Sequence, residues 1–123
     1  MFKLKKLTNA EILEILEIIS EEKENIRLTP TNRAFFIALY NYIRKNGIYD
    51  VAKKKYYIQL TNIQLAEILG FSFTSTSVSL NALKKCGAIE RVRCNEFKKI
   101  SDKEYNVNKP SLTYINSSFL KNY

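Results

Sequence analysis

The stretch TNIQLAEILGFSFTSTSVSLNALKKCGAI, residues 61–89, decides how the chain folds. It opens with Thr61 and Gln64, which have the Thr-x-x-Gln spacing of a capping box, so each side chain can satisfy a backbone N–H of a starting helix. Gly70 stands where a left-handed residue commonly ends a helix. These signals predict a short helix between them. Its apolar face is predicted to carry Ile63, Ala66 and Leu69.

A second helix is predicted after a short connection. Ser72 can cap its start, and Gly87 marks its end. Its apolar face is predicted to carry Thr76, Leu80 and Leu83. Two short helices joined by a glycine-bearing turn and followed by a β-prone run are typical of a DNA-reading helix-turn-helix. The competing interpretation is a pair of core helices without a DNA role, because amphipathic helix pairs are common in small helical domains.

This stretch also resembles the winged helix-turn-helix of bacterial regulators. The usual form of that motif runs Leu-Gly-x-Ser, then a helix with spaced leucines, then Gly-x-Ile leading into the wing. The matching residues here are Leu69-Gly70-Phe71-Ser72, Leu80, Leu83 and Gly87-Ala88-Ile89. The resemblance implies a winged-helix fold in which the second helix faces base edges in a DNA groove.

The wing is predicted from three successive segments. Ala88 to Cys94 is predicted to be a strand, Asn95 to Ser111 a polar loop, and Leu112 to Asn116 the return strand. The loop is long for a wing. Ser101 and Glu104 have the spacing of another capping box, which indicates a helical turn within the loop.

The segment NKPSLTYI, residues 108–115, resembles the end of the N-terminal winged-helix domain of plasmid and phage replication initiators. In that family a Lys-Pro precedes the closing strand, as Lys109-Pro110 does here. Those initiators normally continue into further domains, whereas this sequence ends at Tyr123. We therefore expect a DNA-binding protein of a bacterial mobile element, a plasmid or phage, with replication, partition, conjugative transfer and transcriptional control all open.

The N-terminal region is predicted to form a helix from Asn9 to Glu24, with Thr8 and Glu11 as its capping box. Its apolar residues are Ile12, Leu13, Ile15, Leu16, Ile18 and Ile19. At 100° per residue they cover an arc of roughly 220°, which is more than one packing contact needs. The helix therefore either lies deep against its own domain or contacts a second copy, and we favour a homodimer formed through it.

Two further elements precede the helix-turn-helix. Thr29-Pro30 predicts a helix start, because proline at the first helical position lacks only an N–H that would be free anyway. That helix is apolar almost all round, as expected of a central core helix, and Asn46-Gly47 ends it. Ile48 to Lys55 has no clear period, and Tyr56 to Leu60 is predicted to be a strand that pairs with the wing.

These elements define the predicted fold class as α+β, mainly helical: a winged helix-turn-helix with an extra N-terminal helix and a long wing. At 123 residues the chain is long enough to bury a core without metals or disulfides. Residues 1–28 are predicted to hold the N-terminal amphipathic helix as a dimerisation element. Residues 29–123 are predicted to form the winged helix-turn-helix DNA-binding domain.

Composition argues against several classes. The sequence has two cysteines and no histidine, so a zinc site with four thiolate or imidazole ligands cannot be assembled, and we expect no metal or cofactor. Cys86 and Cys94 are expected to be reduced thiols, because the N-terminus lacks the apolar core and cleavage site of a signal peptide. Acidic residues interrupt every later hydrophobic run, so we expect no membrane span and a cytoplasmic protein.

The net charge of +8 is unevenly distributed along the chain. Residues 1–28 hold five basic and six acidic residues, whereas residues 29–123 hold fifteen basic and six acidic residues. A basic excess confined to the region of the motif fits a polyanion. Double-stranded DNA is therefore the predicted partner, with other replication, partition or transfer proteins as further partners.

The predicted DNA-binding residues are Ser72, Phe73, Thr74, Ser75, Ser77, Val78, Asn81, Lys84, Lys85, Arg91, Arg93, Lys98, Lys99, Lys103 and Lys109. Asn81 could pair with adenine, and Phe73 or Val78 could touch a thymine methyl group. The lysines and arginines are expected to supply most of the affinity by neutralising phosphates. The second helix lacks the arginine that bidentate contact with guanine requires, so specificity is expected to depend on repeated sites or DNA shape.

The protein is not expected to be an enzyme. Acid–base or nucleophilic chemistry needs converging groups, whereas histidine is absent and the carboxylates lie on apparent helix surfaces. The alternative function is a winged-helix protein-interaction module without DNA binding. The wide apolar first helix and the eight tyrosines would suit that role.

Overall fold

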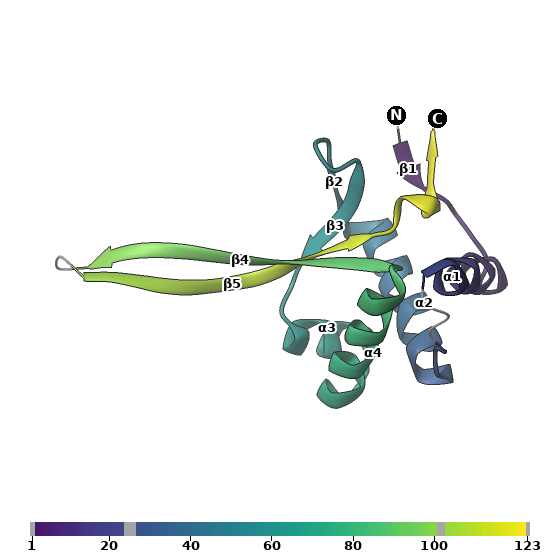
Figure 1. The fold of residues 1–123 in the computed structure, drawn as a ribbon, viewed down its shortest axis with the longest axis horizontal. Helices are drawn as coiled ribbons and strands as arrows, with labels where there is room; N and C mark the ends of the chain where they lie inside the picture. The colour runs from purple at the N-terminus through teal and green to yellow at the C-terminus, as the bar shows by residue number, and fades with distance from the viewer. Residues whose placement is uncertain (1, 24–26, 101–102, 123) are drawn as a thin grey trace.

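The computed structural model describes residues 2–23, 27–100 and 103–122, and for 95–100, 103–108 and 122 it describes the backbone alone. The class is α+β, as predicted (Figure 1). In the described part of the chain, the helices are α1 (Asn9–Lys23), α2 (Pro30–Asn46), α3 (Asn62–Leu69), α4 (Phe73–Cys86) and a 3-10 turn, η1 (Ser117–Phe119). The strands there are β1 (Phe2–Leu4), β2 (Ile48–Asp50), β3 (Lys55–Gln59), β4 (Ile89–Ile100), β5 (Lys103–Ile115) and β6 (Leu120–Asn122).

The helix starts follow the predicted capping signals. The hydroxyl oxygen of Thr8 accepts the backbone N–H of Glu11 at 3.2 Å, and the Glu11 carboxylate accepts the N–H of Thr8 at 3.0 Å. Thr61 and Gln64 make the same reciprocal pair at α3. These bonds satisfy N–H groups that the first turn of a helix leaves free. The predicted last residue of α1, Glu24, lies outside the described residues.

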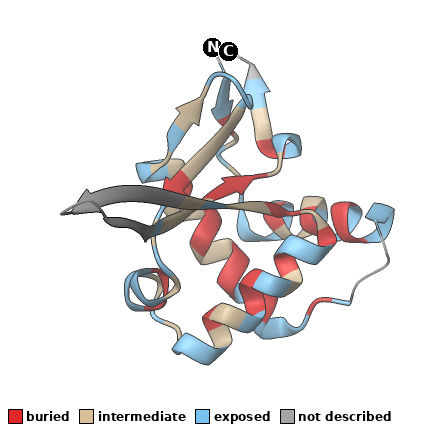
Figure 2. Ribbon diagram, turned by 60° about the vertical axis from the view of Figure 1, so that its left-hand side comes forward, coloured by how far each residue is buried: buried red, intermediate tan, exposed pale blue. Residues whose placement is uncertain are grey.

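The core is centred on one face of α2. The α2 side chains with no exposed surface are Phe35, Phe36, Leu39, Tyr40 and Ile43. α1 and α4 pack against α2 and contribute to the same hydrophobic cluster, and Phe119 joins it with its ring centroid 5.0 Å from that of Tyr40. Figure 2 shows the buried residues gathered where these helices meet the sheet. The N-terminal helix therefore shares one core with the rest of the chain.

The main sheet is antiparallel, with the strand order β2-β3-β5-β4. Residues 57–59 of β3 pair with residues 112–114 of β5. This pairing confirms the prediction that the strand before the helix-turn-helix pairs with the returning strand. It places the base of the β4–β5 hairpin directly against the helices that precede it.

The predicted polar loop from Asn95 to Ser111 is wrong. β4 continues to Ile100 and β5 begins at Lys103, so most of that segment is paired strand. The predicted helical turn is wrong as well, because Glu104 lies in β5, while Ser101 lies outside the described residues. Beyond its contact with β3, the hairpin projects away from the helices (Figure 1). A strand pair without a third strand can form from polar residues, because it covers no core.

Three short strands were missed by the sequence analysis. β2 lies in the segment without a clear period, and β1 and β6 come from opposite ends of the chain. Leu4 lies opposite Leu120 in the β1–β6 pair, and Tyr56 Oη donates to the carbonyl oxygen of Phe2 at 2.8 Å. Three residues are too few to show a period, and β1 and β6 each depend on a partner at the other end of the chain.

The turn between β2 and β3 folds over the face of the sheet that carries Tyr114. Tyr114 Oη donates to Asp50 Oδ2 at 2.8 Å, and Lys53 Nζ lies 4.6 Å from the centre of the Tyr114 ring. Burial, together with the hydrogen bond to Asp50, raises the pKa of Tyr114 to about 12. The same hydrogen bond lowers the pKa of Asp50. These contacts fix the base of the hairpin to the rest of the sheet.

The buried face of α3 differs from the prediction. Leu65 and Ala66 are buried and Leu69 is half-buried, whereas Ile63 is 61% exposed. The prediction followed a spacing of three residues and did not count Leu65. Because the larger Leu65 side chain takes the interior position, Ile63, two residues earlier and about 200° away around the helix, turns to the surface.

Asn32 connects the start of α2 to α4. Its side-chain oxygen accepts the N–H of Thr29 at 3.1 Å, which completes a capping box that the sequence analysis did not recognise. Its Nδ2 donates to Ser79 Oγ at 3.0 Å, and both side chains are buried. Removing Asn32 would leave the Ser79 hydroxyl without this partner in the interior.

We expect Asn32→Ala to lower the free energy of unfolding by about 1–3 kcal/mol, the cost of losing a cap and a buried hydrogen bond. Urea denaturation measures this loss. The matched control is Asn46→Ala at the other end of α2, where the exposed side chain donates to the carbonyl oxygen of Tyr42 at 3.2 Å. It should cost less than about 0.5 kcal/mol. Equal losses in the two variants would show that the buried Asn32–Ser79 hydrogen bond adds no more stability than an exposed one.

Candidate nucleic-acid interface

α3 and α4 are joined by a tight turn at Gly70. Gly70 has φ +77°, the left-handed conformation predicted at this position, and its N–H donates to the carbonyl oxygen of Ala66 at 3.0 Å. Phe71 then packs edge-on against Phe35 of α2, with ring centroids 5.4 Å apart. The start of α4 is therefore held in place by the core.

α4 has one buried face and one exposed stripe. The buried face includes the predicted Thr76, Leu80 and Leu83, which confirms that assignment. The α4 stripe, as we name it, is exposed, follows the i, i+4, i+7 and i+11 spacing of one helix face, and consists of Thr74, Val78, Asn81 and Lys85. All four residues are among the predicted DNA-binding residues.

The other predicted residues of the first α4 turns lie beside this stripe. Ser72 Oγ accepts the N–H of Ser75 at 3.0 Å and so caps the helix, and Ser75 is half-buried. Phe73 is 55% exposed. Ser77 is half-buried, and its Oγ accepts a hydrogen bond from Asn62 Nδ2 at 3.3 Å. Ser77 therefore contacts α3 in addition to bordering the stripe.

The two arginines of β4 have different surroundings. Arg91 is half-buried, its Nη1 donates to Asn62 Oδ1 at 2.7 Å, and burial lowers the pKa of its guanidinium. Arg93, at the irregularity between Val92 and Cys94, is exposed. Both arginines were predicted to contact phosphates, and Asn62 was not among the predicted DNA-binding residues. No local signal could have found Asn62, because its contact with Arg91 spans 29 residues of sequence.

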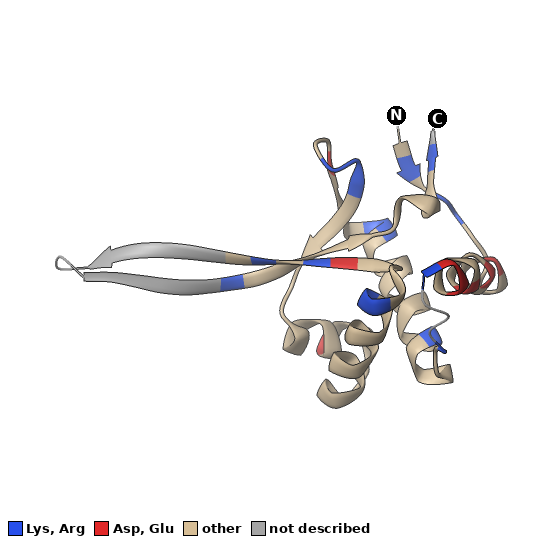
Figure 3. Ribbon diagram, viewed as in Figure 1, with Lys and Arg blue, Asp and Glu red and all other residues tan. Residues whose placement is uncertain are grey.

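Four of the exposed cations lie at the end of α4 and at the base of the hairpin, while the other exposed cations are spread over the rest of the described chain. The four at these two places are Lys84, Lys85, Arg93 and Lys109. Figure 3 shows basic residues at these places, and it shows the acidic residues of α1 on the side of the molecule away from the hairpin. The side chains of Lys98, Lys99 and Lys103 lie outside the described residues, although their backbone lies in the paired strands.

The outer part of the hairpin is not basic as a whole. Residues 95–108 hold three lysines and three acidic residues, so the formal net charge of the segment is zero. Lys99 lies opposite Glu104 in the strand register. Opposite charges at paired positions attract each other and compete with a phosphate for the lysine. The basic character of the region therefore comes from the base of the hairpin and from α4.

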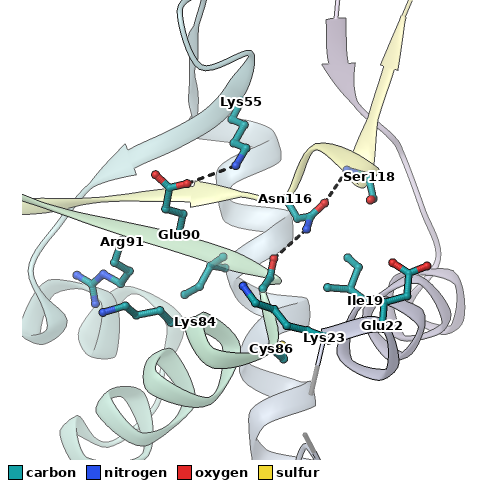
Figure 4. A pocket seen from close by; sticks show the side chains of 12 residues that line it. Ile19, Glu22, Lys23, Lys55, Lys84, Cys86, Glu90, Arg91, Asn116 and Ser118 are labelled. Atoms are coloured by element: carbon teal, nitrogen blue, oxygen red, sulfur yellow. Dashed lines mark hydrogen bonds and ion pairs between the residues drawn. The ribbon is translucent and has the colours of Figure 1, made fainter. Parts of the chain in front are cut away.

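A hollow of about 520 Å³ lies between the ends of α1 and α4 and the start of β4 (Figure 4). Lys23, Lys84 and Arg91 line it, together with Glu90. Glu90 is paired with Lys53, whose hydrogen bond lowers the pKa of Glu90. Two helix C-termini also meet here, and their partial negative charge offsets the cations. The lining also includes Lys55 and Glu22, so its four cations outnumber its two carboxylates, and the helix C-termini offset only part of this excess.

A second hollow, of about 450 Å³, opens on the outer side of α3 and the start of α4. Its lining is mostly apolar and consists of Ile63, Ala66, Glu67, Phe71 and Phe73. Ile63 and Phe73 are both more than half exposed. An apolar surface of this kind is suited to another protein or to apolar groups on DNA bases.

Two solved structures share the fold. One, described as "N-Terminal domain of DNA binding protein", has a TM-score of 0.53 and 16% identity, and the match covers 80% of this chain and 70% of that chain. The other, described as "Structure of Rep-DNA complex", has a TM-score of 0.54 and 19% identity, and the match covers 91% of this chain and 83% of that one. No family model and no curated protein sequence matches the chain.

Two features of the described residues bear on other functions. None of the helices there is long and apolar enough to cross a membrane. Those residues also contain no group of three or more His, Cys, Asp or Glu side chains placed to hold a metal. Cys86 and Cys94 are free thiols in the structure, and burial raises the pKa of the Cys86 thiol.

We expect Gly70→Ala to lower the free energy of unfolding by about 1 kcal/mol, because a Cβ is strained at φ +77°. An added Cβ would meet nothing within 4 Å, so the loss measures backbone conformation alone. Gly70→Asn is the control, since asparagine tolerates the left-handed region and should cost less. Thermal and urea denaturation would measure both. If alanine and glycine proved equally stable, the turn would have to adopt a different conformation in solution.

Proposed function

We propose that the protein binds double-stranded DNA as a winged helix-turn-helix, with α4 in the major groove and the β4–β5 hairpin as the wing. The observation that carries this proposal is the α4 stripe, which is exposed and largely polar while the opposite face of the helix is buried. A single helix fits the major groove, which is about 12 Å wide. The fold shared with a structure described as a Rep-DNA complex supports the same function.

The α4 stripe supplies contacts suited to base edges. Asn81 can pair with adenine through its amide, Val78 can contact a thymine methyl group, and Thr74 can donate or accept a hydrogen bond. Lys85 extends the stripe toward the end of the helix. The stripe has no arginine, so Lys85 is its one side chain that could donate to guanine O6 or N7 as a cation.

Phosphate contacts come from the cations of α4 and of the hairpin base. Lys84 is exposed on α4 next to the stripe, and Arg93 and Lys109 are exposed at the base of the hairpin. Such contacts position a protein on the duplex without carrying sequence information. The acidic residues of α1 lie away from the hairpin (Figure 3). The charge distribution therefore orients the face that carries α4 and the hairpin toward DNA during the encounter.

The biological process within this proposal is DNA replication of a bacterial mobile element, for which the shared fold of the Rep-DNA complex structure is the support. Partition, conjugative transfer and transcriptional control use the same type of DNA contact. The protein acts in the cytoplasm by binding, and other replication, partition or transfer proteins would supply any enzymatic step.

A protein-interaction module without DNA binding is the second candidate. The observation in its favour is the apolar hollow of α3 and α4, where Ile63 and Phe73 are more than half exposed beside the α4 stripe. A folded protein that binds no duplex at low salt would favour this candidate over DNA binding, because phosphate attraction is strongest there.

Arg93→Ala and Asn81→Ala should weaken DNA binding in different ways. Loss of Arg93 should weaken binding to selected and random duplexes alike and flatten the slope of log K against log salt by about 0.9. Loss of Asn81 should leave that slope unchanged and reduce the preference for the selected duplex by about 1–3 kcal/mol. Fluorescence anisotropy titrations at several salt concentrations measure both quantities.

Lys6→Ala is the matched charge control, since Lys6 is exposed in the segment before α1. It should change neither the salt slope nor the preference. Loss of preference in Arg93→Ala, with none in Asn81→Ala, would show that the hairpin reads sequence and that α4 only supports it.

A homodimer through α1 is part of the proposal, with a narrower contact than the sequence predicted. Ile12, Leu16 and Ile19 are buried in the chain's own core, and Ile18 is 51% exposed. Leu13 and Ile15 are half-buried. A second copy would cover Ile18 and Ile15, which are three residues apart on the same side of the helix, whereas Leu13 lies on the other flank of the buried face.

We expect Ile18→Glu to convert the dimer into a folded monomer, because it places a charge in the centre of the proposed contact. Light scattering measures the mass and circular dichroism the fold. Glu14→Gln, at an exposed position on the same helix, is the control and should leave the mass unchanged. A monomer mass for the wild-type protein at a concentration of about 50 μM would remove the dimer from the proposal.

A further inference from the structure

Three side chains from separate elements form a chain of hydrogen bonds beside the α4 stripe. Arg91 of β4 donates through Nη1 to Asn62 Oδ1 at 2.7 Å, and Asn62 Nδ2 donates to Ser77 Oγ at 3.3 Å. Asn62 is the first residue of α3, and Ser77 lies in α4. The chain therefore joins the hairpin, α3 and α4 at a single point.

The direction of these bonds follows from the chemistry of the guanidinium group, which has N–H donors and no acceptor. Of the two ends of the Asn62 amide, only the oxygen can accept a hydrogen bond from Arg91. The amide NH₂ of Asn62 must then face Ser77, so Ser77 has to accept with its oxygen. The hydroxyl proton of Ser77 is left available, and it donates no hydrogen bond within the described part of the structure.

We propose that Arg91 acts through Asn62 to fix Ser77 as a hydrogen-bond donor toward the DNA bases. This inference rests on the DNA binding proposed above. Ser77 lies four residues before Asn81, so one helix face brings the two side chains together at the edge of the α4 stripe. In this proposal Arg91 is a positioning residue for sequence recognition and does not itself contact a phosphate.

A fixed donor reads bases more selectively than a freely rotating hydroxyl. A serine with both lone pairs free is compatible with every base, whereas at Ser77 the hydrogen bond from Asn62 occupies one of the two lone pairs and so favours donation to acceptors in the major groove. Those acceptors are purine N7, guanine O6 and thymine O4, and the amino groups of adenine and cytosine do not match. The chain would therefore give Ser77 a preference that serine lacks on its own.

The burial of Arg91 supports a role other than stability. Its side chain is half-buried, and its Nε has no hydrogen-bond partner among the described residues. A charged group that is buried without its full set of hydrogen bonds costs free energy of folding. An apolar residue of similar length would fold as well or better at this position. Arginine, or another side chain that only donates, is needed here because it fixes the orientation of the Asn62 amide.

The test begins by selecting preferred duplexes from a randomised DNA pool with the wild-type protein. Dissociation constants are then measured for the selected duplex and for each of its single-base-pair variants. Ser77→Ala should lose discrimination by about fivefold at one base pair, which is the ratio that one hydrogen bond is worth. Asn62→Ala should lose the same discrimination at the same base pair, and the double variant should lose no more.

Arg91→Met should also lose that discrimination, with an unchanged salt slope and an unchanged or raised melting temperature. Arg91→Lys should retain part of the discrimination, because lysine is likewise a donor without an acceptor. Arg93→Met is the matched control at the neighbouring exposed arginine. It should flatten the salt slope by about 0.9 and leave the base preferences as they are.

Each contrary result has a distinct meaning. If Asn62→Ala keeps every base preference of the wild type, or if Arg91→Met flattens the salt slope as Arg93→Met does, Arg91 does not position Ser77 and the inference is overturned while DNA binding stands. If the folded wild-type protein binds no duplex at low salt, the proposed function fails and this inference fails with it.

Discussion

The packing of α4 against α2 is the contact on which the rest of the structure depends. The buried face of α2 packs against α4, which contributes Leu80 and Leu83 to the same core and also the buried Asn32–Ser79 hydrogen bond. Because this face of α4 is committed to the core, the opposite face must point outward. Neighbouring residues on a helix are 100° apart, so a rotation by one residue would bury part of the α4 stripe. The core therefore determines which residues can meet a partner.

The helix boundaries could be predicted from sequence because their signals are local. Thr8, Thr61 and Gly70 each act within one turn of their own position, and the structure confirms all three. The short strands could not be predicted, because β1 exists only through β6, more than a hundred residues later. The hairpin was misread for a related reason. Its polar residues look like a loop by composition, and only the pairing of β4 with β5 makes them strands.

In the candidate site, too, the residues set by local periodicity could be predicted and those set by distant contacts could not. The α4 stripe follows from helical periodicity, so Thr74, Val78 and Asn81 were identified from sequence and are exposed as expected. The surroundings of Arg91 could not be inferred that way. A β-strand alternates its faces, and nothing local says which neighbour will lie beside a given arginine. Its contact with Asn62 depends on how β4 crosses the start of α3, which is a property of the whole fold.

Charge sets a limit on how tightly one copy could hold DNA. Four described cations, Lys84, Lys85, Arg93 and Lys109, are exposed on α4 and at the base of the hairpin, and the outer hairpin adds no net charge. If each contacted one phosphate, the salt slope would be about −3.6, whereas proteins with extensive phosphate contacts reach about −10. The α4 stripe has no arginine to add a strong base contact. A single copy would then bind weakly, so tight and specific occupancy requires linked copies on repeated sites, where the second binding event gains from the first.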